Sequence, residues 1–192
     1  MIKAIIFDCF GVLTTDGWLP FKYQHFGDKP DLFEQATDLS RQTDVGMIDF
    51  DDFLQGIGEL AGVPAEEVRR IVTNNVANEL LFQYIASRKS KYKIGVLSNA
   101  SANWLGELFS PDQNGLFDAT ALSCETGRIK PDERAYEIIA ERLGCEPSEC
   151  IMVDDQERYV TGAKDAGMKG VVYRDFEQCR AELDALLANT EA

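Results

Sequence analysis

Four short polar clusters stand at the ends of hydrophobic runs, and their residue types could do chemistry together. The clusters are Asp8 after residues 4–7, Ser98 and Asn99 after residues 94–97, Lys130 before Pro131, and Asp154 and Asp155 after residues 151–153. In an open parallel α/β sheet the ligand crevice lies outside the carboxyl ends of the strands, so these side chains would converge there. Carboxylates beside an ammonium group can hold a divalent cation and a phosphate together. The pattern therefore points to an enzyme.

The first two clusters each allow a second interpretation. Gly11 follows Asp8 by three residues and permits a tight turn that leaves the carboxylate at the crevice, where it could act as a nucleophile. A single carboxylate after a strand could equally be a solvated turn residue. Ser98 and Asn99 could cap a helix, or they could bind phosphate oxygens through the hydroxyl and the backbone N–H groups of a helix start.

The last two clusters differ in how easily they are explained without a ligand. Lysines are usually solvated, but Lys130 could instead neutralise both a nucleophile and incoming phosphate oxygens. Adjacent carboxylates at a strand end repel each other unless a cation offsets the repulsion. The pair Asp154-Asp155 is therefore the cluster that most favours a bound cation.

An alternation of short strands and helices accounts for the placement of these clusters. From residue 92 onward the sequence predicts strands at 92–97, 119–122, 151–153 and 171–173, each followed by a helix, at 102–109, 132–143, 159–166 and 176–187. Such a series predicts a parallel sheet with right-handed crossovers. The fold class is therefore α/β, a Rossmann-like parallel sheet with helices on both faces.

The first strand is followed by a long stretch without strand runs. Residues 16–88 show helical patterns at 31–41, 49–61, 65–75 and 79–88. We therefore predict a core domain of residues 1–15 and 89–192 and an inserted small helical cap of residues 16–88. A cap in this position could close over the crevice.

Composition excludes several other classes of protein. The chain has 192 residues, of which 19 are basic and 33 acidic, and its net charge of −14 predicts repulsion of nucleic acid and of anionic membranes. No apolar run approaches the roughly 18 residues of a membrane span, and Asp8 cuts short the opening run. The cysteines are scattered and odd in number, which predicts reduced thiols. We expect a cytoplasmic protein, and the sequence leaves its oligomeric state open.

Taken jointly, in this order and at these spacings, the clusters resemble the motifs of the haloacid dehalogenase superfamily of phosphohydrolases. The resemblance implies that Asp8 is the nucleophile, Ser98 the second-motif hydroxyl, Lys130 the third-motif lysine, and Asp154 and Asp155 the acidic pair. It also implies Mg²⁺ as cofactor, held by the carboxylates of Asp8 and Asp155 and by the backbone carbonyl of Phe10. Asp154 would then hold Lys130 or a metal-bound water.

The resemblance also implies a reaction. Asp8 would attack phosphorus to form a phosphoaspartate, which water would then hydrolyse. Because the cap is small, a small phosphorylated metabolite is the expected substrate, rather than a protein or a nucleic acid.

Two positions depart from the pattern of the superfamily. Its phosphatases usually carry a second aspartate two residues after the nucleophile, which protonates the leaving oxygen, and here that position is Phe10. Because general acid–base help is worth roughly 10²–10⁴-fold in rate, we expect acyl or aryl phosphates to be favoured over alkyl esters. Asp16 or His25 could act as a surrogate acid. Tyr159 stands where many relatives have an Asp or Asn that supports the metal site.

The sequence therefore leaves two alternatives to a phosphatase. With an aromatic residue at position 10, the chain also resembles the superfamily's 2-haloacid dehalogenases, which use the same nucleophile on carbon without a metal. Against this alternative, Asp154 and Asp155 would repel a haloacid anion unless a cation were bound. A non-catalytic binding or regulatory protein is favoured by Phe10 and Tyr159. Against that interpretation, a scaffold has no physical need for a costly cluster of charges.

Overall fold

The structure of the protein is a computed structural model, and it describes residues 1–188. Its centre is a five-stranded sheet in the order β3-β2-β1-β4-β5, and every pair of neighbouring strands is parallel. The strands are β1 (Ala4–Phe7), β2 (Lys93–Ser98), β3 (Ala119–Leu122), β4 (Cys150–Asp154) and β5 (Lys169–Val172). The predicted parallel α/β sheet is confirmed.

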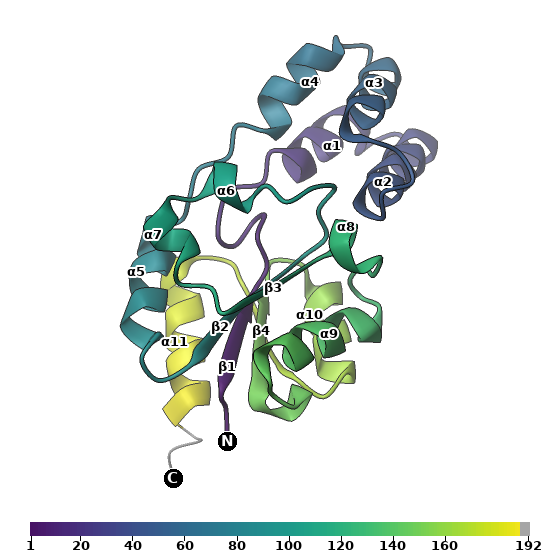
Figure 1. The fold of residues 1–192 in the computed structure, drawn as a ribbon. Helices are drawn as coiled ribbons and strands as arrows, with labels where there is room; N and C mark the ends of the chain where they lie inside the picture. The colour runs from purple at the N-terminus through teal and green to yellow at the C-terminus, as the bar shows by residue number, and fades with distance from the viewer. Residues whose placement is uncertain (189–192) are drawn as a thin grey trace.

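Helices cover both faces of the sheet (Figure 1). On one face lie α5 (Glu79–Arg88) and α11 (Phe176–Ala188), and on the other lie α9 (Glu133–Leu143) and α10 (Glu157–Asp165). Strand β1 is wholly apolar because both of its faces are covered. Ile5 and Phe7 pack on the side of α5 and α11, and Ala4 and Ile6 pack on the side of α9 and α10. Side chains of a strand alternate between faces, so a strand buried on both sides has no polar positions.

A second group of helices lies beyond the carboxyl ends of the strands (Figure 1). It comprises α1 (Trp18–Phe26), α2 (Pro30–Asp44), α3 (Phe50–Ala61) and α4 (Ala65–Val72). These helices have a hydrophobic cluster of their own, built around Phe21, Phe26, Leu54 and Ile57. Local signals mark the helix ends: the Asp49 side chain accepts a hydrogen bond from the Asp52 N–H at the start of α3, and Gly62 ends that helix in the left-handed conformation.

Helix α5 packs against the sheet, although the predicted cap of residues 16–88 would include it. Its residues Leu81, Phe82 and Ile85 pack into the hydrophobic layer of the sheet, and the Tyr84 hydroxyl donates a hydrogen bond of 2.8 Å to Asp184 of α11. The separate helical group therefore ends before residue 79. Helical periodicity predicts that an apolar face exists, but not which surface it will cover.

The remaining connections are short. They contain α6 (Leu105–Leu108), α7 (Pro111–Asn114), α8 (Ser123–Thr126) and a 3₁₀ turn at Pro147–Glu149. The predicted helix at 102–109 is thus reduced to one turn. Within residues 1–188, none of the helices combines the length and the apolar character needed to cross a bilayer.

Candidate active site

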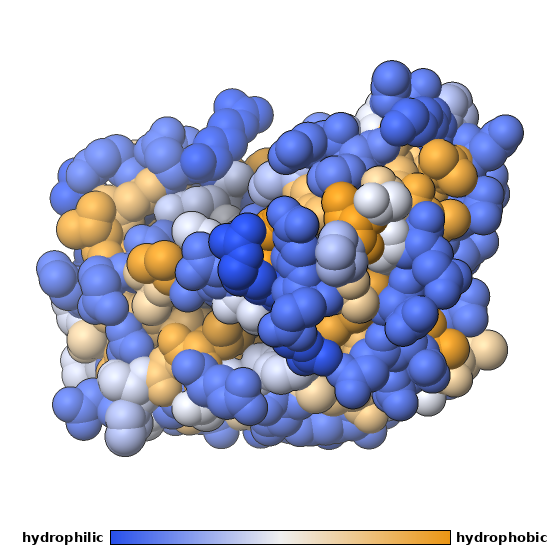
Figure 2. Space-filling view, turned by 90° about the horizontal axis from the view of Figure 1, so that it is seen from above, coloured by the Kyte–Doolittle hydropathy of each residue, from blue (hydrophilic) through white to orange (hydrophobic). Residues whose placement is uncertain are grey.

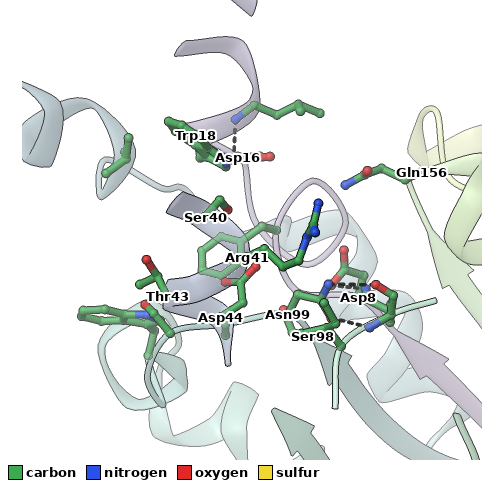
Figure 3. A pocket seen from close by; sticks show the side chains of 18 of the residues that line it. Asp8, Asp16, Trp18, Ser40, Arg41, Thr43, Asp44, Ser98, Asn99 and Gln156 are labelled. Atoms are coloured by element: carbon green, nitrogen blue, oxygen red, sulfur yellow. Dashed lines mark hydrogen bonds and ion pairs between the residues drawn. The ribbon is translucent and has the colours of Figure 1, made fainter. Parts of the chain in front are cut away.

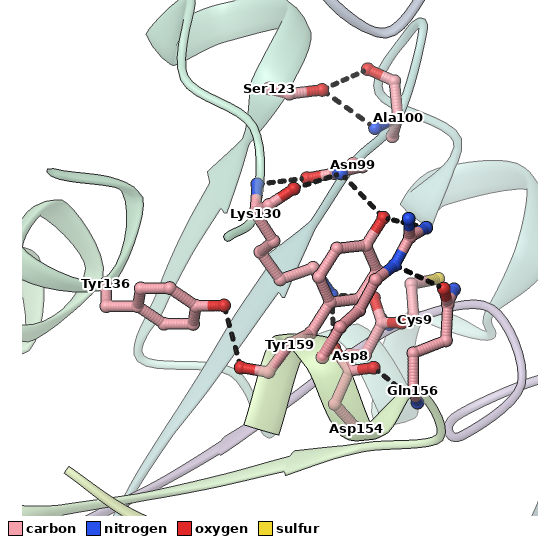
Figure 4. A network of polar contacts seen from close by, with 11 residues as sticks. Asp8, Cys9, Asn99, Ala100, Ser123, Lys130, Tyr136, Asp154, Gln156 and Tyr159 are labelled. Atoms are coloured by element: carbon pink, nitrogen blue, oxygen red, sulfur yellow. Dashed lines mark hydrogen bonds and ion pairs between the residues drawn. The ribbon is translucent and has the colours of Figure 1, made fainter. Parts of the chain in front are cut away.

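Two carboxylates share one ammonium group at the carboxyl edge of the sheet. The Lys130 Nζ lies 2.8 Å from Asp8 Oδ1 and 2.6 Å from Asp154 Oδ2 (Figure 4). Asp8 directly follows β1 and Asp154 ends β4, so the parallel pairing of these strands brings both carboxylates to one point. The family resemblance implied two alternatives for Asp154, Lys130 or a metal-bound water, and the structure shows the contact with Lys130.

The three charged residues Asp8, Lys130 and Asp154 are almost completely buried. Asp8 is 6% exposed, Lys130 2% and Asp154 0%. Burial alone would lower the pKa of Lys130, but Asp154 and Asp8 outweigh it and hold the pKa above its ordinary value. Burial raises the pKa of Asp8, against the opposing effect of Lys130. A buried ion pair of this kind is costly to desolvate and adds little net stability, which favours a functional role.

Two further residues hold Lys130 in place. Asn99 accepts a hydrogen bond of 2.8 Å from the Lys130 backbone N–H and donates one of 3.2 Å to the Lys130 carbonyl. The ring of Tyr159 lies 4.9 Å from the ammonium, within reach of a cation–π contact. The side chain of Asn99 is thus engaged with the lysine backbone, which leaves the backbone N–H of Asn99 for the expected phosphate contact.

Asp155 and Ser98 carry buried polar atoms that lack partners. Carboxylate oxygens of Asp8, Asp154 and Asp155 lie within 4.8 Å of one another. Among residues 1–188, Asp155 Oδ1 and Ser98 Oγ are buried without a hydrogen bond, although buried polar atoms are normally paired. Burial and the charge of Asp8 raise the pKa of Asp155 to about 6. This set of hard oxygen donors fits a cation such as Mg²⁺.

Gly11 explains how Asp155 can approach the loop after β1. Its φ is +84°, and a Cβ atom at this position would lie 2.6 Å from Asp155 Oδ2. Any other residue would therefore be strained in its backbone and would displace the carboxylate. The tight turn expected from the sequence is a packing requirement of the site.

The site opens into a cavity of about 670 Å³ between the sheet and the helical group (Figure 3). Asp8, Phe10, Ser98, Asn99 and Lys130 line its floor. Seen from above, this end of the molecule shows apolar side chains set among a mostly hydrophilic surface (Figure 2). The walls mix aromatic and charged residues, namely Trp18, Lys22, Arg41, Asp44, Phe50, Trp104 and Arg158.

The two residues considered as surrogate acids lie in different places. Asp16 lines the cavity, but its Oδ1 accepts hydrogen bonds from the N–H groups of Trp18 and Leu19. His25 stacks on Phe21 with 4.2 Å between ring centroids and is not among the described residues that line the cavity.

Sequence reasoning missed the cavity residues that the helical group contributes. Arg41 and Asp44 belong to α2 and lie three residues apart on one side of that helix. No local pattern distinguishes them from the other charged residues of α2. Only the docking of the helix beyond the sheet edge brings them to the cavity.

Comparison with known proteins identifies the family of the chain. A family model for haloacid dehalogenase-like hydrolases matches residues 2–167. The chain is 38% identical over 216 residues to phosphatase MT3486 of Mycobacterium tuberculosis, covering 93% of this chain and 90% of that protein. It is 28% identical to acyl-CoA dehydrogenase family member 10 of Mus musculus, covering 96% of this chain but 19% of the mouse protein.

Solved structures show the same fold. A haloacid dehalogenase family enzyme of Bacteroides thetaiotaomicron, bt-2542, was solved in complex with magnesium and inorganic phosphate. It superposes with a TM-score of 0.69 at 23% identity and covers 91% of this chain and 95% of its own.

Proposed function

The chain belongs to the haloacid dehalogenase-like hydrolases, and we propose that it is a Mg²⁺-dependent phosphatase of a small phosphorylated metabolite. The observation that carries this proposal is the buried Asp8–Lys130–Asp154 group beside the unpaired atoms of Ser98 and Asp155. A nucleophilic carboxylate, a fixed cation and a free hydroxyl at one point are what phosphoryl transfer requires. The names of relatives, such as phosphatase MT3486, support the same reaction class.

Each residue has a defined task in this proposal. Asp8 attacks phosphorus and forms an aspartyl phosphate, which water then hydrolyses. Lys130 neutralises the nucleophile and the phosphoryl oxygens, and the Ser98 hydroxyl donates to one of those oxygens. Asp8, Asp155 and the Phe10 carbonyl would hold Mg²⁺, which when bound neutralises phosphate charge and lets a carboxylate approach an anion.

The cavity supports a small anionic substrate. Its volume of about 670 Å³ lies within the usual range for small-molecule sites. Lys22, Arg41 and Arg158 line it although the chain as a whole carries a net charge of −14. Together with Lys130 they offset the acidic residues that also line the cavity, and they can pair with an anionic ligand.

A screen of phosphorylated metabolites with and without Mg²⁺ tests the proposal. Phosphate release that requires Mg²⁺ is the expected result. Halide release from 2-haloacids without metal would instead show the dehalogenase alternative. Ligand binding without release of phosphate or halide would show a binding protein.

Mg²⁺ should raise the melting temperature more at pH 8 than at pH 5. In the folded protein the pKa of Asp155 is raised from 3.8 to about 6, so folding favours the protonated carboxyl. In the metal-free protein this protonation stabilises the fold fully below about pH 4, and the stabilisation is lost as the pH rises through about 6. Protons therefore compete with the cation at pH 5 but not at pH 8. At 100 times its Kd, the ion should add about 2.7 kcal/mol to the free energy of unfolding. Scanning calorimetry measures the difference, and an equal shift at both pH values, or an undiminished one in Asp155→Asn, would contradict it.

Replacing Gly11 with alanine should weaken Mg²⁺ binding by roughly 10–100-fold, as is typical when the support of a metal ligand is disturbed. Gly62→Ala is the matched control, because Gly62 has a φ of +70° but a Cβ atom added there would meet no atom of the described residues within 4 Å. Both variants should lose roughly 1–2 kcal/mol of stability from the left-handed backbone. Calorimetric titration with Mg²⁺ should separate them, since only Gly11→Ala displaces Asp155. Equal affinities in the two variants would refute the packing argument.

A further inference from the structure

Phe10 stands two residues after Asp8 and cannot protonate a leaving oxygen, and Asp16 in the same loop already accepts hydrogen bonds from the start of α1. We propose that Asp44 of α2 supplies that proton and later takes one from water, so that the helical group contributes the general acid and base. This inference rests on the proposed phosphatase function. It assigns a catalytic role to a residue outside the four motifs.

The position of Asp44 is the first argument. It is the last residue of α2, and its side chain projects into the cavity that Asp8, Ser98 and Asn99 also line (Figure 3). The leaving group of a phosphate ester on Asp8 must extend away from the sheet edge, toward the helical group. Asp44 faces the nucleophile from that side.

A contact with the core fixes the end of α2 in this place. The Ser123 hydroxyl donates a hydrogen bond of 2.6 Å to the Asp44 carbonyl. The Ser123 Oγ atom also accepts a hydrogen bond of 2.9 Å from the Ala100 N–H, which lies in the loop that follows Ser98 and Asn99. The backbone of Asp44 is therefore tied to the segment that carries the second motif, which restricts its distance from the reacting groups.

The chemical state of Asp44 is the second argument. The Asp44 carboxyl is half-buried and makes no hydrogen bond or ion pair within residues 1–188. By contrast, one carboxylate oxygen of Asp16 accepts hydrogen bonds from the backbone at the start of α1. Burial raises the pKa of Asp44 to about 7, with Lys130 lowering it and Asp8 raising it. Such a group holds a proton near neutral pH and can release it. The other charged residues that line the cavity are Asp16, Lys22, Arg41, Glu107 and Arg158.

The two steps balance in atoms and electrons. In the first, an Asp8 oxygen forms a bond to phosphorus, the bond from phosphorus to the ester oxygen breaks, and that oxygen takes the Asp44 proton to leave as an alcohol. In the second, water attacks phosphorus and gives a proton to the Asp44 carboxylate. The bond between phosphorus and Asp8 then breaks, which releases phosphate and restores both aspartates.

The dependence on leaving group tests this role. We compare wild type with Asp44→Asn on an alkyl phosphate and on p-nitrophenyl phosphate, whose leaving group needs little protonation. The variant should lose roughly 10²–10⁴-fold in kcat/KM on the alkyl ester and less than about tenfold on the aryl ester. The alkyl-ester rate of wild type should fall above about pH 7, where Asp44 loses its proton, and this limb should be absent in the variant.

Glu34→Gln is the control, since it removes one negative charge from an exposed position of the same helix. Asp44→Ser is made in parallel with Asp44→Asn. The kinetic comparison with wild type then uses whichever of the two variants keeps the wild-type melting temperature. Equal losses on both esters would overturn the role of Asp44, as would a wild type that hydrolyses only aryl esters. A wild type that hydrolyses no phosphate ester would instead remove the proposed function, and this inference with it.

Discussion

Replacing Asp8 with asparagine should reduce phosphate release by roughly 10⁴–10⁶-fold, the scale on which loss of a nucleophile acts. An amide oxygen is a far weaker nucleophile than a carboxylate and cannot form the aspartyl phosphate. The amide keeps the shape of the side chain, so its oxygen can still accept the 2.7 Å hydrogen bond from the Cys9 N–H. Single-turnover assays with the best substrate of the metabolite screen measure the loss.

The fold of this variant should stay close to wild type. Lys130 keeps its contact of 2.6 Å with Asp154 when Asp8 loses its charge. The substitution also removes a buried carboxylate whose ionised form burial disfavours. Thermal unfolding should therefore show a folded protein without turnover. Activity within about tenfold of wild type would show that Asp8 is not the nucleophile.

Replacing Lys130 with methionine should destabilise the protein by about 3–5 kcal/mol, because Asp8 and Asp154 would remain buried without their shared cation. For a chain of this size the loss corresponds to a fall of roughly 6–20 °C in melting temperature. Turnover should disappear as well, since the ammonium group no longer neutralises the approaching phosphate. Denaturant titration and the phosphate assay measure the two effects.

A double variant separates the two roles of Lys130. Adding Asp154→Asn to Lys130→Met removes one of the two unpaired carboxylates, so part of the lost stability should return. Activity should not return, because no cation has been restored beside Asp8. If the single variant unfolds at the wild-type temperature, the three-charge group is not held as the structure shows it.

The arrangement of the motifs is the part of this site that sequence alone could predict. Asp8, Ser98 and Asp154 each stand at the end of an apolar run, and parallel strands all end at the same edge of a sheet. Alternation of strands and helices was enough to predict that sheet. Convergence of these residues thus follows from local patterns combined with one rule of topology.

The partners of the motif residues could not be predicted in this way. Asn99 clamps the backbone of Lys130, a residue 31 positions away, and Tyr159 covers the ammonium of the same lysine. Helix α5 has an apolar face like that of α3, yet one packs on the sheet and the other in the helical group. Such choices depend on which surfaces fit each other after collapse.

The sequence by itself thus determined the family, the parallel sheet and the four motifs that meet at its edge, because each of these depends on short-range pattern and strand direction. Tertiary structure alone decided that α2 docks over Asp8 and places Asp44 in the cavity, and that α5 packs on the sheet. Contacts between distant segments arise from the shape and charge of packed surfaces, and one-dimensional patterns do not specify these.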